Sequence, residues 1–323
     1  MLDVVALGEL LIDFVTLDMD FAGYPTMKAN PGGAPCNYLA TLSAYDAKTA
    51  FIGKVGDDAF GTMLIDTMKQ LGIDTSGICK DQNVFTTLAF VTLDDKGDRT
   101  FSFARKPGAD TCLRYNEIDL SMIDNAEWLH FGTLSLTTEP IVSTTRKVID
   151  YAKSKGKKIS FDPNLRLPLW NNQILAKNQI EWGLRQADVV KISDEEVKFM
   201  WNDITYDQAI KKLLVDYGVK LVLLTLGEKG SYVANENACV RVRSRKVIPV
   251  DTTGAGDIFG GSAISCFLKK KKEPQNLVKE DLEDIGRFAC ATAGLSTQRQ
   301  GGIPSIPKIR EVYSEMEHNT EIY

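Results

Sequence analysis

The sequence predicts an α/β protein built on a parallel sheet that is covered by helices. From residue 128 onward, short apolar runs alternate with segments of helical periodicity, and such a succession forms a parallel sheet. Polar residues gather where these runs end, and open parallel sheets bind ligands beyond the carboxyl ends of their strands. Residues 85–105 instead contain two strand-like runs joined by a charged turn, which predicts a separate hairpin.

The spacing of apolar residues gives the expected elements. Strands are expected at 3–7, 49–55, 88–93, 100–104, 128–132, 158–162, 188–192 and 221–226. Helices are expected up to residue 45, at 58–71, 139–155, 171–186 and 207–217, from 257 to the lysine run at 269–272, and at 281–296 and 309–317. Between residues 14 and 30, Gly23 and Pro25 interrupt the pattern, which indicates a strand or an extended excursion.

Bulk properties restrict the classes of function. With 323 residues and 44% apolar content, the chain is long enough for one large α/β domain with an appendage, or for two modest domains. The net charge of −5 and the pI near 5.3 argue against nucleic acid or an anionic membrane as the main partner. The six cysteines form no Cys-x-x-Cys pair, and there is no basic leader or membrane-length apolar window, so we expect reduced thiols and a cytoplasmic protein.

The most informative stretch is residues 251–257, Asp-Thr-Thr-Gly-Ala-Gly-Asp, ahead of a helical segment. Gly254 and Gly256 allow consecutive N–H groups to converge at the positive end of a helix dipole, which suits a phosphate. Asp257 lies in the same first turn, where it could reach a hydroxyl, although an acidic first turn is also common in ordinary helices. Phe259 occupies the position of a third glycine and no Gly-Lys-Ser/Thr occurs, which excludes a dinucleotide fingerprint and a Walker loop.

A second glycine pair precedes a helical segment within residues 30–37. Gly32 and Gly33 permit a ligand to touch the backbone, and Asn37 offers a donor and an acceptor, but Pro-Gly-Gly is also an ordinary turn. Arg105 ends the hairpin and is positioned either to project over what the hairpin covers or to lie solvated on the surface. Further polar clusters follow the strands at 162–166, 191–196 and 225–230. The two histidines leave little room for a histidine-based site, and His130 is expected to pack in the core.

Three segments together carry a resemblance to a known family: Gly32-Gly-Ala-Pro-Cys-Asn37, Phe51-Ile-Gly-Lys-Val-Gly-Asp-Asp-Ala-Phe-Gly61 and the 251–257 loop. From about residue 3 to residue 307 the chain resembles the PfkB, or ribokinase-like, carbohydrate kinases. The resemblance implies a three-layer α/β/α sandwich with a mostly parallel sheet at 1–13, 31–84 and 106–323, and a small β lid at 14–30 and 85–105. Residues 162–166 and 105–110 look most like bacterial fructokinases.

The resemblance also implies roles for individual residues. Asp257 would be the base, and Gly254, Ala255 and Gly256 would form the anion hole. The sugar would be held by Asp13, Gly32, Gly33, Asn37, Phe103, Arg105, Asn164 and Arg166. ATP would be bound by Lys191, Ser193, Thr225, Gly227, Gly230 and Cys290. Glu196 would organise Mg²⁺ through water, and a monovalent cation, usually K⁺, would be held by Asp251, Thr253, Ser305 and carbonyls near 298–301.

Three positions depart from the family pattern. Ser193 stands where Asn is usual, so its direct contact with a phosphate or a metal-bound water is an open question. Leu39 replaces a small residue and is expected to tighten the packing of the helix beneath the sugar loop. Asp46 replaces a glycine in the following turn, and Asp tolerates the left-handed conformation.

The leading hypothesis is an ATP-dependent fructokinase that makes fructose 6-phosphate. The alternative is a 2-keto-3-deoxygluconate kinase, because Arg105 and Arg166 could equally grip a carboxylate, and nucleoside or ribose kinases are a third option. A kinase-like sugar sensor without turnover is the alternative that is not an enzyme, and a nicotinamide dehydrogenase lacks its third glycine. Since edge strands are commonly paired or covered, we also expect a homodimer formed through the lid strands.

Overall fold

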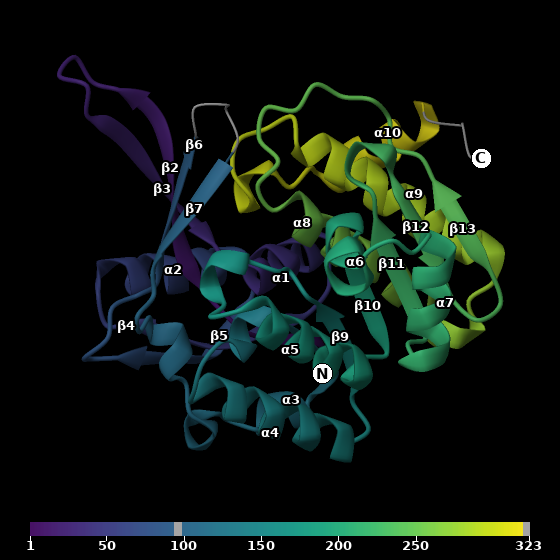
Figure 1. Ribbon diagram of the computed structural model, residues 1–323, viewed down its shortest axis with the longest axis horizontal. Coiled ribbons are helices and arrows are strands. Elements are labelled where there is room, and N and C mark those ends of the chain that lie inside the picture. Colours follow the sequence, from purple (N-terminus) through teal and green to yellow (C-terminus); the bar gives the residue numbers. More distant parts are fainter. Residues whose placement is uncertain (94–98, 319–323) are drawn as a thin grey trace.

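The computed structural model describes residues 1–93 and 99–318, and the expected hairpin turn at 94–98 lies outside them. Two sheets organise the chain (Figure 1). The large sheet has nine strands in the order β13-β12-β11-β10-β9-β8-β1-β4-β5, and the small sheet has four in the order β3-β2-β6-β7. The α/β architecture with a mostly parallel sheet is therefore confirmed.

The strands of the large sheet are β1 (Leu2–Leu7), β4 (Thr49–Gly56), β5 (Asp74–Asp81), β8 (Ala126–Gly132), β9 (Lys158–Asp162), β10 (Val189–Ser193), β11 (Leu221–Thr225), β12 (Ser231–Ala234) and β13 (Cys239–Val242). All pairs from β5 to β11 are parallel, whereas β12 and β13 add in antiparallel fashion. Sequence reasoning missed β5, β12 and β13. β5 reads Asp-Thr-Ser-Gly-Ile-Cys-Lys-Asp and lacks a continuous apolar run, while the other two have four residues each.

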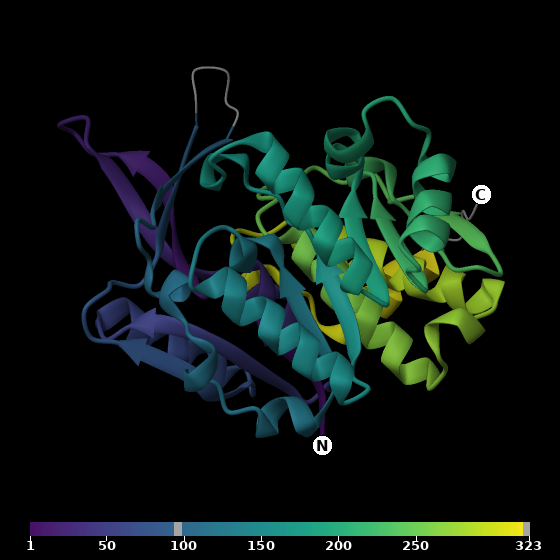
Figure 2. The ribbon, with the colours of Figure 1, turned by 60° about the horizontal axis from the view of Figure 1, so that its bottom comes forward.

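The described helices are α1 (Ala34–Ala44), α2 (Ala59–Gln70), α3 (Ser121–Asp124), α4 (Ile141–Ser154), α5 (Gln173–Gln186), α6 (Asp194–Trp201), α7 (Tyr206–Asp216), α8 (Ala255–Lys270), α9 (Lys279–Ser296) and α10 (Ile309–His318). The helices expected from periodicity are present, with ends that differ by up to a few residues. Helices lie on both faces of the large sheet, as the view in Figure 2 shows.

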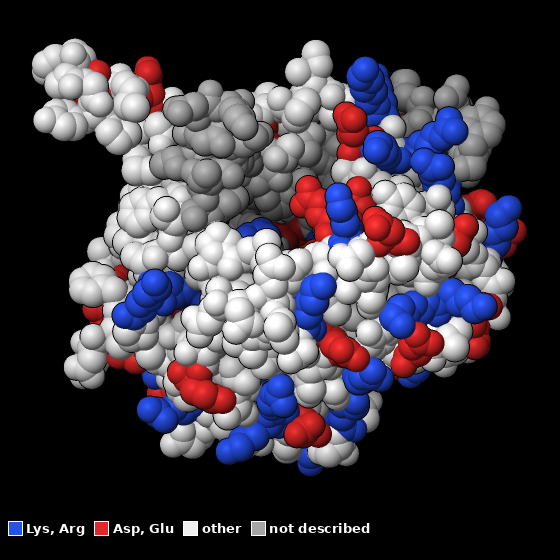
Figure 3. All heavy atoms as spheres, viewed as in Figure 1, with Lys and Arg blue, Asp and Glu red and all other residues white. Residues whose placement is uncertain are grey.

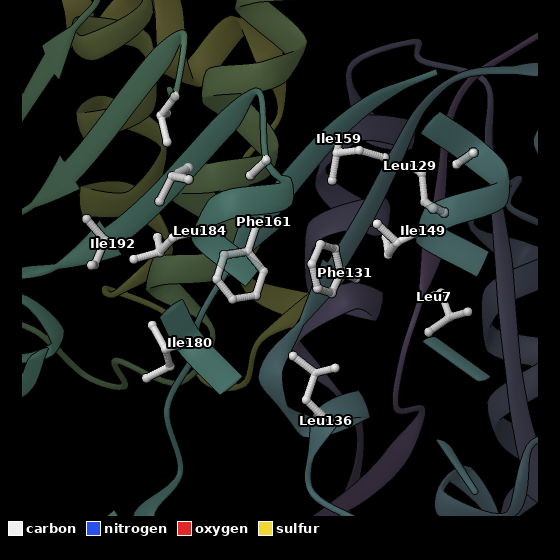
Figure 4. Close-up of a cluster of buried hydrophobic side chains, with 14 of the residues drawn as sticks. Leu7, Leu129, Phe131, Leu136, Ile149, Ile159, Phe161, Ile180, Leu184 and Ile192 are labelled. Carbon is white, nitrogen blue, oxygen red and sulfur yellow. The ribbon is translucent and has the colours of Figure 1, made fainter. Parts of the chain in front are cut away.

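Side chains of β1 explain why both faces are covered. Val5 and Leu7 belong to one hydrophobic cluster, which contains the apolar faces of α4, α5 and α7. Val4 and Ala6 belong to a second cluster, which contains those of α1, α2, α8 and α9. Because successive side chains of a strand point to opposite faces, the central strands must be apolar throughout. Figure 4 shows the first cluster, where the Phe131 and Phe161 rings lie 4.7 Å apart.

The small sheet, which is called the lid below, consists of two hairpins. β2 (Leu11–Met19) pairs antiparallel with β3 (Pro25–Gly32), β6 (Leu88–Leu93) pairs antiparallel with β7 (Arg99–Ala104), and β2 pairs parallel with β6. The expected hairpin over 88–104 is confirmed, and the excursion at 14–30 is a second hairpin. β2 already begins at Leu11, so Asp13 lies on a lid strand.

Other expectations concern single residues. All six cysteines are free thiols. His130 is buried, stacks on Tyr38 with ring centroids 3.8 Å apart, and contacts Ser160 Oγ at 3.1 Å, as expected for a core residue. Asp46 has a φ of 73°, the left-handed conformation anticipated for it, and Leu39 is fully buried. In the described ranges, no helix has both the length and the apolar character needed to cross a membrane.

Candidate active site

The first turn of α8 places Asp257 at a meeting point of three segments. Gly254, the N-cap, has a φ of 73°, which lets the chain turn into the helix. Asp257 is 7% exposed, and its Oδ2 accepts a hydrogen bond of 2.9 Å from Asn37 Nδ2 on α1. Its Oδ1 lies 3.4 Å from Asn164 Nδ2, on the loop after β9. The carboxylate therefore faces α1 and the loop at the carboxyl end of β9.

Two opposing effects act on the pKa of Asp257. Burial raises it above the usual range of an aspartate, whereas the Lys191 ammonium, the Asn37 amide and the Arg166 guanidinium act to lower it. The net direction is upward. A carboxylate whose affinity for a proton is increased in this way is suited to act as a general base.

The second glycine loop lies against the same place from the lid side. A Cβ on Gly32 would overlap Asp13 Oδ2, so only glycine allows the loop to approach this carboxylate. Burial raises the pKa of Asp13 to about 7, Arg166 acts to lower it, and Asp257 acts to raise it further. Asp13, Arg166 and Asp257 therefore lie close enough for their charges to interact, and their contacts with a sugar stay a prediction.

Asn37 connects this region to residues 251–257, which are called the anion loop below. Its side chain is buried, and Nδ2 donates to Asp257 while Oδ1 has no hydrogen-bond partner among the described residues. The amide also borders Gly254 and Gly302, where a Cβ would approach it to 3.0 and 2.7 Å. A buried unpaired acceptor is costly, and a hydroxyl or N–H from a ligand would satisfy it.

Lys191, near the end of β10, brings a cation to the start of α8. Its Nζ makes a buried ion pair of 3.0 Å with Asp162 Oδ2 and lies 3.0 Å from the point that a Cβ on Gly256 would occupy. Burial raises the pKa of Asp162 to about 7, although the ammonium acts to lower it. An ammonium and a helix N-terminus are both positive, and an anion placed between them would relieve their repulsion.

Ser193 and Glu196 form a reciprocal cap at the start of α6. Ser193 Oγ accepts from Glu196 N at 3.2 Å, and Glu196 Oε2 accepts from Ser193 N at 2.8 Å. Glu196 Oε1 also accepts from Leu165 N at 2.9 Å, which ties α6 to the loop after β9. The carboxylate is thus held rigidly beside Asp162 and Lys191, and Ser193 has a structural role that explains why a serine is accepted there.

The remaining residues expected to bind nucleotide lie at the adjacent strand end. Thr225 ends β11 in register with Ser193 on one side and Ser231 on the other. Gly227 and Gly230 both have positive φ in the turn that follows. Cys290 Sγ, on α9, lies 3.3 Å from Ser231 Oγ and is buried. These residues share one edge of the sheet, and their binding of nucleotide stays a prediction.

Comparisons with known proteins agree with this geometry. The model of the pfkB family of carbohydrate kinases matches residues 1–309. The chain belongs to the pfkB family. It is 39% identical over 312 residues to fructokinase-2 of Solanum lycopersicum, which covers 95% of this chain and 94% of that protein. It is similar to the crystal structure of Xylella fastidiosa fructokinase with bound ATP, with a TM-score of 0.90, 30% identity and 99% of each chain covered.

A third relative has three ligands. A double-mutant fructokinase from Vibrio cholerae O395, solved with fructose, ADP and a potassium ion, is 30% identical with a TM-score of 0.86 and 98% of each chain covered. The face of the present kinase shown in Figure 3 is hollowed near its centre, where side chains of both charges are visible.

The kinase holds Asp251 beside the C-terminal loop. Asp251 Oδ1 accepts from Thr253 N at 2.9 Å and Oδ2 accepts from Gly301 N at 2.8 Å, while Ser305 Oγ donates to Gly302 O at 2.7 Å. Oxygen atoms of carboxylate, hydroxyl and carbonyl groups therefore gather next to the anion loop, and such ligands suit K⁺. In the part of the chain that is described, no group of three His, Cys, Asp or Glu residues could hold a metal ion.

The structure contradicts one of the two expectations for Arg105, that of a solvated surface side chain. Its guanidinium is buried and donates to Asp110, Thr137 and the carbonyl of Leu134, and its expected contact with the sugar stays a prediction. Phe103, two residues earlier, pairs through Ala89 with Asp13 across the lid sheet. The expected sugar contact of Phe103 is compatible with this register and stays a prediction.

Sequence reasoning missed two carboxyl groups beside the sugar loop. Glu9 is buried, and its Oε1 accepts from Ala34 N, the first residue of α1, at 2.9 Å. Asp110 pairs with Arg105 and accepts from Thr87 Oγ1. The available signal was an acidic residue directly after an apolar strand in one case, and an Arg-x₄-Asp spacing after the hairpin in the other.

Proposed function

We propose that this pfkB kinase transfers the γ-phosphoryl group of ATP to the primary hydroxyl of D-fructose, which gives fructose 6-phosphate and ADP. The observation that carries the proposal is the buried Asp257 carboxylate, hydrogen-bonded to Asn37 at the open start of α8. The similarity to fructokinases over almost the whole chain supports the choice of sugar.

The reaction follows from the arrangement of this chain's groups. The sugar hydroxyl oxygen attacks the γ-phosphorus and loses its proton to Asp257, while the bond from phosphorus to the β,γ-bridging oxygen breaks and its electrons leave with ADP. The N–H groups of Gly254, Gly256 and Asp257 at the start of α8 and the nearby Lys191 ammonium stabilise the negative charge of the transferring group. Such preorganised donors commonly contribute the largest share of the rate enhancement.

The sugar is held between the two sheets in this proposal. Asp13 accepts from its hydroxyls on the lid side, and Asn37 does so on the side of the large sheet. Gly32 and Gly33 let the sugar approach the backbone. The charge of Arg166 acts on both Asp13 and Asp257, and its guanidinium would donate to the sugar from their vicinity. A bound sugar also supplies a partner for the unpaired Asn37 Oδ1.

Two metal ions fit the residues that are present. Mg²⁺ bound to the ATP phosphates would supply charge neutralisation, and the fixed Glu196 carboxylate would accept hydrogen bonds from its water ligands. K⁺ fits beside Asp251, Thr253 and Ser305, where oxygen ligands surround the loop after α9. These residues keep the anion loop in place, since Asp251 connects it to Gly301.

The test is a coupled assay of ADP release with ATP and Mg²⁺, with and without KCl, on fructose, ribose and 2-keto-3-deoxygluconate. We expect fructose to have the highest kcat/KM. Asp257→Asn should reduce kcat by about 10³-fold or more and leave fructose binding largely intact, as measured by calorimetry. Tight binding of fructose without any ADP would instead establish a sugar sensor, and near-normal turnover of the variant would remove Asp257 as the base.

We further propose a homodimer formed through the lid. The β2–β3 hairpin carries several exposed apolar side chains at its far end: Leu17, Met19, Phe21 and Tyr24. β3 and β7 are the edge strands of the lid sheet, and exposed edges are commonly covered. Analytical ultracentrifugation that finds only monomer at working concentration would contradict the dimer.

We also place the kinase in the cytoplasm, because use of ATP and six free thiols are both typical of that compartment.

A further inference from the structure

Arg105 uses almost all of its hydrogen-bonding capacity inside the protein. Nε and Nη2 both donate to Asp110 Oδ2, at 2.8 and 2.6 Å. Nη1 donates to Thr137 Oγ1 at 2.9 Å, and Nη2 also donates to the Leu134 carbonyl at 2.9 Å. One Nη1 hydrogen has no partner among the described residues. The side chains of Arg105 and Asp110 are 3% and 2% exposed, so water does not screen this pair.

Contacts of the lid strands connect the Arg105–Asp110 pair to the neighbourhood of Asp13. Asp13 pairs with Ala89, and Ala89 pairs with Phe103, so these three side chains share one face of the lid sheet. Arg105 follows β7, which ends at Ala104, and its partner Asp110 accepts from Thr87 Oγ1. The carbonyl of the same Thr87 accepts from Ile12 N, the residue before Asp13. The guanidinium also lies close enough to Glu9, the cap of the sugar loop, to act on its pKa. In the proposed complex the Arg105–Asp110 pair therefore lies near the sugar, and Asp110 already balances the charge of Arg105.

We propose that Asp110 determines specificity: by neutralising Arg105, it makes the kinase select an uncharged ketose and reject sugars that carry a carboxylate. This inference rests on the proposed fructokinase function and explains how it differs from the 2-keto-3-deoxygluconate alternative. An arginine without an internal partner would bind a substrate carboxylate in a bidentate manner. Here Asp110 occupies that position, and a second carboxylate would meet a like charge without receiving a pair of donors.

Asp110→Asn tests the proposal, because asparagine has nearly the same shape and removes only the negative charge. We expect the ratio of kcat/KM for 2-keto-3-deoxygluconate to that for fructose to rise about tenfold or more. The gain should appear as a lower KM for the sugar acid, since the substitution changes binding and leaves Asp257 untouched. A role of Asp110 in folding alone would lower both activities together and leave the ratio unchanged, which would overturn the proposal.

Two further variants separate charge from packing. In Asp110→Asn combined with Arg105→Gln, no unbalanced guanidinium remains, so the ratio should return to within about threefold of the wild-type value. Thr87→Val removes the hydroxyl that donates to Asp110 Oδ1 without changing any charge, and it should leave the ratio unchanged. A rise of the ratio in either variant equal to that in Asp110→Asn would show that loosened packing, rather than the Arg105 charge, sets specificity.

The outcome is distinguishable from failure of the proposed function. If the wild-type kinase phosphorylates fructose and the ratio is insensitive to Asp110, only the specificity proposal fails. If the wild type prefers the sugar acid from the outset, the fructokinase assignment fails as well. Thermal melting of each variant, with and without fructose, checks that the folded state and the sugar site persist.

Discussion

Helices α1 and α8 begin alike but are completed differently. Each starts at a glycine with positive φ, Gly33 at 110° and Gly254 at 73°. They pack directly against each other, and Gly261 of α8 has no room for a Cβ beside the Tyr38 carbonyl, 2.6 Å away. This close approach brings Asn37 of α1 within hydrogen-bonding distance of Asp257 of α8.

The difference lies in what meets the N–H groups. The buried Glu9 carboxyl accepts from Ala34 N at the start of α1, so the protein supplies the partner itself. At the start of α8, Ala255 N donates to the Thr252 carbonyl, and the N-cap Gly254 has no side chain to accept from the N–H groups that follow. A glycine loop ahead of a helix is therefore an anion site only where the rest of the chain leaves the helix end open.

The largest expected effect comes from alanine at the two glycines. Gly33→Ala should cost about 3 kcal/mol or more of unfolding free energy, because its φ is unfavourable and the new Cβ would lie 2.5 Å from the Glu9 carbonyl oxygen. Gly254→Ala should cost only about 1–2 kcal/mol of unfolding free energy, since its new Cβ would meet Asn37 Nδ2 at 3.0 Å. Its main effect should be a lower kcat, because the substitution disturbs the N–H groups at the start of α8. Urea unfolding and steady-state kinetics measure both. Equal losses of stability would contradict the conclusion that the start of α1 is capped by the protein and the start of α8 is left open for a ligand.

A smaller effect concerns pH. Burial raises the pKa of Glu9 to about 7, well above its value of 4.5 in an unfolded chain. Between these values the folded state keeps a proton that the unfolded state releases, so the contribution of Glu9 is fully present below pH 4.5 and is lost as pH rises through 7. Glu9→Gln cannot titrate and should flatten the stability profile in this window by on the order of 1–3 kcal/mol.

Urea unfolding at pH 4.5, 6 and 8 checks this prediction. The profile should keep some slope, because the pKa values of Asp13 and Asp162 are also raised to about 7. A Glu9→Gln profile parallel to the wild-type profile would show that Glu9 is ionised at the start of α1. The start of α1 would then hold a negative charge of the protein's own, which the start of α8 lacks.

The smallest effects are expected where the two helices end. Lys271 follows α8 with a φ of 51°, and Asp46 follows α1 with a φ of 73°. Lys271→Gly should add up to about 1 kcal/mol of stability, because lysine is disfavoured in the left-handed region. Asp46→Gly should add at most a few tenths of a kcal/mol, since Asp tolerates this conformation and glycine has the larger entropy cost. Thermal melts of the two variants distinguish these values, and a larger gain at Asp46 would be contrary to expectation.

The sequence predicted the six neighbouring strands from β11 to β4 because they are buried on both faces and read as continuous apolar runs, whereas the flanking strands β5, β12 and β13 do not. It also predicted the segments that meet at Asp257, since Asn37 follows the second glycine pair and Asn164 follows the carboxyl end of the parallel strand β9. The partners of buried charges could not be predicted in this way. Glu9 and Ala34 are 25 residues apart, and the closure of Arg105 by Asp110 depends on side-chain directions in the hairpin, which periodicity does not determine.

Asp13 belongs to the lid, whereas Asn37 and Asp257 belong to the large domain. In the proposed complex, fructose thus contacts the lid and the large domain at the same time. Its binding free energy therefore includes the cost of holding the lid against the large domain. An inhibitor that mimics only the phosphate-facing half of the sugar would not make the contact with the lid. Compounds designed against this kinase should therefore extend to the Asp13 carboxyl, where a hydroxyl or amine would secure the lid.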